Sequence, residues 1–284
     1  MAVTLALLLG CTLKAEERRE VPIPDLVITA TDFSFAAPDT VEAGLRRVRL
    51  VNQGESPHHV QLLRLDDTTT VDQVLDRAQR DELVMPGVTY VGGPDLPRPG
   101  TEGDVVVDLA PGRYLMLCYM PMGKVRHLAM GMTRQLVVVP GAPDKAKLPF
   151  ADAHMVLDSY SFRLMGELTA GRRVIRVENV AEEPHEVFLA QVPAGRSAKE
   201  VLQWLQKKAG PPPFLPAGGT LMLSRGRNAY VSADLVAGEY VLMCFVPDSR
   251  DGKPHIAHGM VRAITVRSNQ AVNRAPSEPV VDHR

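Results

Sequence analysis

The chain of 284 residues carries the same pattern in its first and second halves. RVRLVNQGESPHHVQLL (residues 47–63) matches VIRVENVAEEPHEVFLA (residues 174–190). DVVVDLAPGRYLMLCYMP matches NAYVSADLVAGEYVLMCFVP, and HLAMGMTRQLVVV matches HIAHGMVRAITV, in the same order. A duplication of this extent indicates two homologous folding units, so each half must supply a complete fold.

Short apolar or alternating runs bounded by Gly, Pro and Asp predict β-strands in each half. Aromatic residues make up only 5% of the chain, while turn-forming residues recur throughout. We therefore predict a mostly β protein, with each half an antiparallel sandwich or Greek-key barrel. The strands predicted in the first half are residues 47–51, 60–65, 105–109, 113–119 and 135–139.

One helix is predicted within each half, at residues 70–80 (TVDQVLDRAQR) and 197–208 (SAKEVLQWLQKK). Each opens on a good N-cap residue and has apolar residues at helical spacing. We expect Trp204 and Leu205 to be buried anchors of the second helix. The Pro/Gly-rich segments after the helices are interpreted as ordered connections, with docking surfaces as the alternative.

These patterns divide the chain into two domains joined by a linker rich in Pro, Ala and charge (PGAPDKAKLPFADA). The predicted division is residues 1–25 for the N-terminal segment, 26–139 for domain 1, 140–153 for the linker, 154–267 for domain 2 and 268–284 for a loose tail.

The N-terminal apolar run of residues 2–9 ends at Gly10-Cys11 and then turns polar. It is too short to span a bilayer. The LLGC sequence resembles a bacterial lipobox, which implies export to the periplasm or another extracytoplasmic space and lipidation of Cys11. Membrane contact is expected only through this anchor. The net charge of −1 gives no basic field for nucleic acid.

One cysteine then remains in each half, so the chain has no disulfide framework. Each half presents a His, then a Cys after a long gap, then the motif His-x4-Met. Two imidazoles, one thiolate and a weak axial thioether are the ligands of a trigonal blue-copper site. The candidate ligands are His58, Cys118, His127 and Met132 in the first half, and His185, Cys244, His255 and Met260 in the second.

The chain resembles the cupredoxin family, which includes plastocyanin, azurin and auracyanin, once in each half. The resemblance rests on VNQGESPHHV, on the Gly-x-Tyr-x-x-x-Cys run that ends at Cys118 and at Cys244, and on His-x4-Met. It implies cupredoxin-like domains, a copper cofactor at the eight candidate ligands, one-electron transfer and a redox partner protein.

Two features depart from that family. Eight and ten residues separate the Cys from the second His, where familiar cupredoxins have only a few, so the loops are expected to be less preorganised. The family commonly has Asn after its first His, whereas this chain has His59 and Glu186. Because neighbours on a strand face opposite ways, we expect His59 to be a surface residue, with support for the cysteine loop coming from elsewhere or missing.

The two centres are not expected to be equivalent. Lys124 and Arg126 in the first loop would disfavour a cation there, so the first site is predicted to be the weaker. In the second half, His258 could replace Met260 as a ligand and give a harder site.

Three rival functions stay open. Buried Cys and Met also occur in cores without metal, so the chain could be a copper-free binding scaffold. The methionines at positions 116, 120, 122, 130 and 132 could serve copper(I) storage or delivery. A multicopper oxidase is disfavoured, because Tyr119 and Phe245 follow the cysteines and the sequence has no His-x-His pair. No other catalytic motif is found, so we expect a carrier or binding protein and no enzyme.

Overall fold

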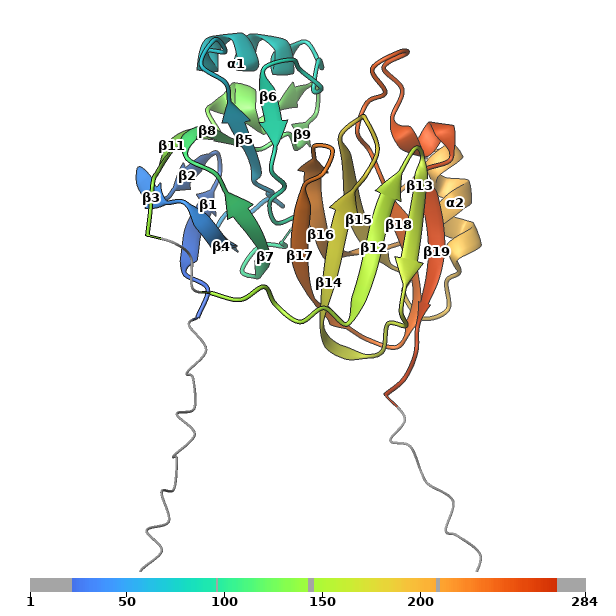
Figure 1. Ribbon diagram of the computed structural model, residues 1–284. Helices are drawn as coiled ribbons and strands as arrows, with labels where there is room; N and C mark the ends of the chain where they lie inside the picture. The colour runs from blue at the N-terminus through green and yellow to red at the C-terminus, as the bar shows by residue number, and fades with distance from the viewer. Residues whose placement is uncertain (1–21, 96, 143–145, 208–209, 270–284) are drawn as a thin grey trace, which may run out of the picture.

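The computed structural model describes residues 22–95, 97–142, 146–207 and 210–269. Cys11 and most of the predicted tail therefore lie outside the described residues. Within these ranges the protein is mostly β, as predicted, with the two halves side by side (Figure 1). No helix in the described part is long and apolar enough to cross a membrane.

The first half is a sandwich of two sheets. Its strands are β1 (Asp25–Thr31), β2 (Ser34–Ala36), β3 (Thr40–Glu42), β4 (Gly44–Asn52), β5 (Gln61–Leu65), β6 (Val88–Tyr90), β7 (Glu102–Leu109), β8 (Gly112–Leu117) and β11 (Thr133–Val139). Strands β2-β1-β4-β7 form one layer and β3-β11-β8-β5-β6 the other. All five strands predicted from the sequence are present. The strand predicted over residues 113–119 ends at Leu117, which leaves Cys118 as the first residue beyond it.

The second half repeats this arrangement. Its strands are β12 (Ala153–Asp158), β13 (Ser161–Met165), β14 (Gly171–Asn179), β15 (His185–Gln191), β16 (Leu215–Leu223), β17 (Asn228–Leu235), β18 (Gly238–Met243) and β19 (Val261–Val266). Strands β13-β12-β14-β17 face β16-β15-β18-β19. The pairing is not wholly antiparallel, because β1 with β4, β3 with β11 and β12 with β14 are parallel. Between β1 and β4 the chain crosses to the other sheet, where it forms β3, and then returns to the first sheet. As a result β4 runs parallel to β1.

The tyrosine of the repeated Gly-x-Tyr motif fixes the start of each cysteine-bearing strand. Tyr114 and Tyr240 are buried, and each donates its hydroxyl to a main-chain carbonyl four residues earlier, Ala110 O at 2.8 Å and Val236 O at 3.1 Å. A buried hydroxyl requires such a partner. The motif therefore sets the direction of β8 and β18 toward their cysteines.

The two halves are joined through both layers, along what we call the seam. Strands β7 and β17 pair antiparallel, Val105 with Val231, which makes one eight-stranded sheet from both halves. In the other layer, Val91 bridges Leu223 and Pro94 bridges Thr220 on β16. The segment of residues 91–95 is thus an ordered connection, as interpreted from the sequence, and its burial in the seam rules out the docking-surface alternative for these residues. The domain boundaries stay a prediction.

Both predicted helices are present, α1 (Val71–Gln79) and α2 (Ala198–Lys207), and Figure 1 shows each on the outside of its own half. Thr70 caps α1 as expected. Trp204 and Leu205 are only partly buried, so the prediction that they are buried is wrong, although Leu205 packs against the apolar cluster beneath α2. A short helix on a sheet surface buries a narrow stripe, and the buried residues of α2 are Ala198 and Val201.

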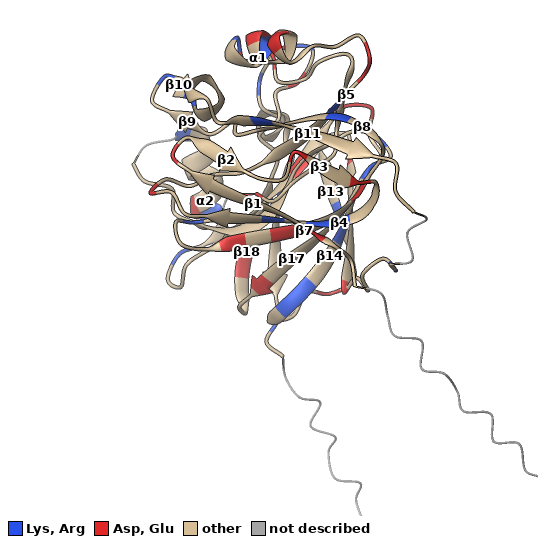
Figure 2. Ribbon diagram, turned by 90° about the vertical axis from the view of Figure 1, so that its left-hand side faces the viewer, with Lys and Arg blue, Asp and Glu red and all other residues tan. Residues whose placement is uncertain are grey.

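Charged residues of both signs are interspersed over neighbouring strands (Figure 2). Arg49 on β4, for example, lies 2.8 Å from Glu102 on β7 and 3.1 Å from Asp25 on β1. These side chains are partly exposed, so each pair adds little to stability.

Two glycines let a backbone segment of each half lie close to a neighbouring segment of the same half. Gly93 and Gly219 occupy equivalent positions of the repeat, with φ of +144° and +141°. A Cβ on Gly93 would lie 1.9 Å from Val60 O, and a Cβ on Gly219 would lie 1.9 Å from Val187 O. No side chain fits these positions without moving the backbone.

We expect Gly93→Ala and Gly219→Ala each to lower the free energy of unfolding by about 2–3 kcal/mol, from backbone strain and steric conflict. Denaturant titration of each variant measures the change. Gly103→Ala on β7 is the control, because its added Cβ would have no neighbour nearer than 3.7 Å. Equal stability of all three variants would contradict the close approach.

Candidate metal centres

The first candidate centre lies where three segments of the first half meet. His58 precedes β5, Cys118 follows β8, and His127 begins a 3-10 helix, η1 (His127–Met130). The two Nδ1 atoms are 3.1 Å apart and Cys118 Sγ is 3.5 Å from His127 Nδ1. The three side chains are at most 3% exposed, and their ligand atoms lie within 4.8 Å of one another.

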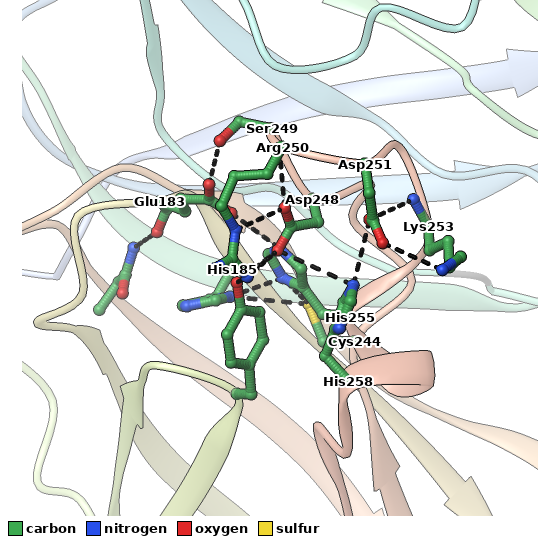
Figure 3. A network of polar contacts seen from close by, with 12 residues as sticks. Glu183, His185, Cys244, Asp248, Ser249, Arg250, Asp251, Lys253, His255 and His258 are labelled. Atoms are coloured by element: carbon green, nitrogen blue, oxygen red, sulfur yellow. Dashed lines mark hydrogen bonds and ion pairs between the residues drawn. The ribbon is translucent and has the colours of Figure 1, made fainter.

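The second candidate centre repeats this geometry (Figure 3). His185 begins β15, Cys244 follows β18 and His255 begins η2 (His255–His258). The two Nδ1 atoms are 2.9 Å apart, and Cys244 Sγ lies 3.4 Å from His255 Nδ1 and 3.9 Å from His185 Nδ1. The structure thus brings together the predicted Cys and two His of each half, although metal ligation by them stays a prediction.

Main-chain hydrogen bonds bring each predicted methionine back to its cysteine. Cys118 N–H donates to Met132 O at 3.2 Å, and Met132 N–H donates to His127 O at 3.0 Å. The corresponding distances at Cys244, Met260 and His255 are 3.3 and 3.0 Å. Both methionines are fully buried, so each thioether is kept from solvent in the segment that closes the centre.

The long loops are held at both ends. His127 N–H donates to Met120 O and His255 N–H donates to Val246 O, at 2.8 and 2.9 Å. In each half the carbonyl two residues after the Cys therefore accepts the amide of the second His. The first loop also folds into a hairpin of β9 (Pro121–Met122) and β10 (Val125–Arg126), and the second is bridged between Pro247 and Pro254. Local hydrogen bonds therefore organise both loops despite their length, and the expectation that they are less preorganised than shorter loops stays a prediction.

His59 and Glu186 support the cysteine loops from within. His59 is only 7% exposed and its Nε2 accepts Tyr119 N–H at 2.8 Å. Glu186 is 9% exposed and its Oε1 accepts Phe245 N–H at 2.8 Å. The expectations that His59 lies at the surface and that this support comes from elsewhere are both wrong. Because neighbouring residues point to opposite faces, His59 does point away from the first candidate centre. The face toward which it points is covered by the seam and is not exposed to solvent.

Burial shifts the pKa values of both cysteines and of three of the candidate histidines toward their neutral forms. It raises the pKa of Cys118 to about 12 and that of Cys244 well above its usual value. Burial lowers the pKa of His185 to about 4 and, together with the neighbouring imidazole, lowers that of His127. At neutral pH the second centre therefore offers two neutral imidazoles, and in both centres the protonated thiol must lose its proton to bind a metal.

A carboxylate faces the outer nitrogen of one imidazole in each centre. Asp32 Oδ1 lies 2.5 Å from His58 Nε2, and Glu183 Oε2 lies 3.0 Å from His255 Nε2. A proton held on Nε2 leaves the Nδ1 lone pair directed at the centre. His185 Nε2 is buried without a hydrogen-bond partner among the described residues. In the first half a carboxylate, Asp32, therefore supports the His that precedes the Cys in sequence. In the second half Glu183 supports the His that follows the Cys.

An aromatic ring covers the imidazoles of each centre. Phe33 lies edge-on to His127 with ring centroids 4.7 Å apart, and Tyr160 lies 5.3 Å from His255. Both occupy the turn between the first two strands of their half. Sequence reasoning missed these rings and the carboxylate Asp32, although TDFSF (residues 31–35) and DSYSF (residues 158–162) carry the repeat that could have identified them.

Polar groups surround the second centre (Figure 3). The Tyr160 hydroxyl donates to Asp248, and Arg250 donates to both of these residues. His258 lies in this rim, with its Nε2 3.1 Å from Asp251 Oδ1 and 3.9 Å from Asp248 Oδ2. His258 is thus engaged with carboxylates, while Met260 is the fully buried residue.

One of the two charges expected to weaken the first centre is paired. Arg126 makes an ion pair of 2.7 Å with Asp81 and donates to Tyr119 O at 2.8 Å. Asp32 adds a negative charge beside His58, and hydrogen bonds, led by that from Glu55 N–H, lower the pKa of Asp32. That the first centre is the weaker stays a prediction.

The donor set fits copper. A thiolate and two imidazoles in a buried pocket suit copper in both common oxidation states, whereas hard cations prefer oxygen ligands. The carboxylates nearest the ligands face the outer nitrogens of the imidazoles.

A scan against protein-family models found no match, and a search of curated proteins found no relative. Among solved structures, the chain is similar to auracyanin from Roseiflexus castenholzii, with 19% identity, 41% of this chain and 97% of that chain covered, and a TM-score of 0.31. It is also similar to auracyanin A, a "blue" copper protein from Chloroflexus aurantiacus, with 16% identity, 42% of this chain and 100% of that chain covered, and a TM-score of 0.31. A third similar structure is copper nitrite reductase from Nitrosomonas europaea, with 15% identity, 88% of this chain and 95% of that chain covered, and a TM-score of 0.26. Likenesses this distant carry none of the functional argument, which rests on the ligand geometry.

Proposed function

We propose that this protein is an exported copper protein that carries single electrons through a Cys/His/His/Met centre in one or both halves. The observation that carries the proposal is the convergence, twice in one chain, of one Sγ and two Nδ1 atoms within 4.8 Å. Duplication from one ancestor explains the repeated order of these residues. It does not require both copies to keep the side chains buried and directed at one another.

The residues favour electron transfer over tight storage of one oxidation state. Copper, when bound, would supply one-electron chemistry by alternating between its +1 and +2 states. The chain contributes a water-poor pocket whose ligands are fixed by main-chain hydrogen bonds and by His59 or Glu186. Ligands that cannot move reorganise little when the charge of the centre changes, which is the requirement for fast electron transfer.

Catalysis by a linked copper cluster is the enzyme-class rival. It would need a ligand directly after the Cys and further grouped histidines, but Tyr119 and Phe245 occupy the first of these positions. Among the described residues, no group of three imidazoles is close enough to hold one ion. An electron carrier therefore fits these residues better.

Copper(I) storage is the second rival, and the thioethers of the first loop disfavour it. Met116 is fully buried in β8, while Met122 and Met130 are 52% and 42% exposed. Thioethers divided between core and solvent do not form one multi-copper pocket.

We place the protein outside the cytoplasm, held to a membrane through lipidation at Cys11, where it would exchange electrons with a redox partner protein. Support for this part comes from the LLGC sequence alone.

Replacing either cysteine should remove one centre. We expect the parent protein loaded with copper(II) to show an intense sulfur-to-copper charge-transfer band, and Cys118→Ser or Cys244→Ser each to lose about half of it. Visible and electron-spin spectra of the three proteins, with metal analysis, measure this. Met260→Leu should shift the band of the second centre, while His258→Ala should leave it unchanged, which decides between the two candidate ligands.

Other outcomes separate the rivals. Loss of the whole band in one variant would mean that only that half binds copper. Absence of retained copper in the parent would favour the copper-free scaffold. Colourless binding of more than two copper(I) ions per chain would favour storage.

Copper binding should release about one proton per centre at pH 7, because each thiol carries its proton until the metal displaces it. The pKa of Cys118 is raised to about 12, and that of His185 is lowered to about 4. From neutral pH upward, the proton on the thiol competes with the metal for the sulfur, and the apparent affinity should rise about tenfold per pH unit. Calorimetric titrations in buffers of different ionisation enthalpy count the protons. Binding without proton release would contradict thiolate ligation.

Cys11→Ser should move the protein from the membrane fraction to the soluble extracytoplasmic fraction when it is expressed in a lipoprotein-processing bacterium. Fractionation and mass spectrometry of the N-terminal peptide test this. An unlipidated parent would contradict the anchor without bearing on the copper centres.

A further inference from the structure

The carboxylates beside the two candidate metal centres face different histidines of the repeat. Asp32 Oδ1 lies 2.5 Å from the outer nitrogen, Nε2, of His58. Glu183 Oε2 lies 3.0 Å from Nε2 of His255 (Figure 3). His58 is the candidate ligand before the cysteine of its half, whereas His255 is the one after the cysteine. The second half therefore does not repeat the contact of the first.

A turn that precedes the first histidine has the same structure in both halves. Gly54 N–H donates to Asn52 Oδ1 at 2.9 Å, and Ala181 N–H donates to Asn179 Oδ1 at 3.0 Å. Gly54 and Ala181 therefore occupy equivalent positions of the repeat. Ala181, which is buried, has a Cβ where Gly54 has none.

That one methyl group decides where a carboxylate fits. A Cβ on Gly54 would lie 2.6 Å from Asp32 Oδ1 and 2.7 Å from His58 Nε2, so only a glycine leaves room for the contact between these two atoms. In the second half Ala181 supplies the methyl group. His185 Nε2 is buried there without a hydrogen-bond partner among the described residues. The carboxylate of the second half instead faces the other imidazole.

Both carboxylates are held in place by further hydrogen bonds. Asp32 accepts Glu55 N–H at 2.8 Å, and Glu183 accepts the Ser249 hydroxyl. An ionised carboxylate can only accept a hydrogen bond. In the neutral imidazole that each carboxylate faces, Nε2 therefore carries the proton and Nδ1 is left as an acceptor.

This arrangement fixes the direction of the hydrogen bond between the two imidazoles of each centre. His58 Nδ1 lies 3.1 Å from His127 Nδ1, and His255 Nδ1 lies 2.9 Å from His185 Nδ1. Because Nδ1 of His58 and of His255 are acceptors, His127 and His185 must donate. His185 Nε2 is then an acceptor without a proton, and an unpaired buried acceptor is tolerated more readily than an unpaired buried N–H.

We propose that Asp32 and Glu183 are positioning residues that set the imidazole tautomers of the two centres in opposite order. Asp32 makes His58 the preset ligand of the first centre, and Glu183 makes His255 the preset ligand of the second. The inference rests on the proposed function in that copper would bind the preset Nδ1 lone pair. It adds that the other histidine of each centre must first move its proton from Nδ1 to Nε2.

The first test uses the metal-free protein at about pH 8.5, about two units above the ordinary pKa of imidazole. Long-range proton–nitrogen NMR of protein with labelled histidine distinguishes Nδ1–H, Nε2–H and doubly protonated rings. We expect Nε2–H rings at His58 and His255, and Nδ1–H rings at His127 and His185.

The second test moves the carboxylate within the first half. Asp32→Ser combined with Ser56→Glu installs the residues that the second half has at the equivalent positions. We expect the tautomers to reverse, with Nε2–H at His127 and Nδ1–H at His58. Gly54→Ala keeps the carboxylate but removes the room for its contact. It should change the ratio of the His58 tautomers by about tenfold or more, because the lost hydrogen bond is to a charged group.

The third test uses copper in the Cys244→Ser background, in which only the first centre remains. Asp32→Ser and Gly54→Ala should each weaken copper binding there by about 10–100-fold. Asp81→Asn is the matched control, because Asp81 pairs with Arg126 of the first loop and faces neither imidazole of the centre. It should change the affinity by no more than about twofold.

Three results would overturn the proposal: tautomers in the same order in both halves, a double variant that keeps the order of the parent, or equal effects of Asp32→Ser and Asp81→Asn on copper binding. If the Asp32 variants do not fold, Glu183→Ser decides the question in the second half, where the ratio of the His255 tautomers should change by about tenfold or more. If the parent binds no copper, the proposed function fails, while NMR of the metal-free protein still decides whether the carboxylates set the tautomers.

Discussion

Each candidate centre depends on a small ring of main-chain hydrogen bonds that closes the loop after the cysteine. Leu128 N–H donates to Cys118 O and Ile256 N–H donates to Cys244 O, both at 3.0 Å. With the bonds to Met132 and Met260, they pin the second His beside the thiol. The ring joins residues at the ends of strands, so the eight or ten residues between Cys and His can vary without moving the ligands.

The seam adds a second constraint, because it turns the residue after each first ligand into the interior. In an isolated half, His59 and Glu186 would face solvent and could satisfy themselves with water. Once β7 pairs with β17 and residues 91–94 lie on β16, the two side chains must find partners inside the protein. The amides of Tyr119 and Phe245 are those partners. Association of the halves therefore organises the metal loops as well as burying apolar surface.

The sequence predicted the parts that depend on local pattern. Strand periodicity, the Thr70 cap and the duplicated order of His, Cys and His placed the elements and the converging side chains correctly. The error at His59 and the unpredicted burial of residues 91–95 arise because the environment of both is created by the other half. Alternation along a strand says that His59 faces away from its ligand neighbour, but not whether another sheet covers that face. A usable signal was present, since the repeat pairs His59 with Glu186, two polar residues inside otherwise apolar strands.

The surroundings of the two centres have diverged more than their ligands. Phe33 covers the first centre, and Met122 and Val125 are exposed on its loop. Tyr160 covers the second, held by Asp248 and Arg250 in a rim of charged groups (Figure 3). Under the proposed function, the first loop offers apolar contact to a redox partner, whereas the second offers directional polar contacts. Charged rims steer encounter and depend on ionic strength, whereas apolar contacts do not, so the two centres would exchange electrons with different kinds of surface.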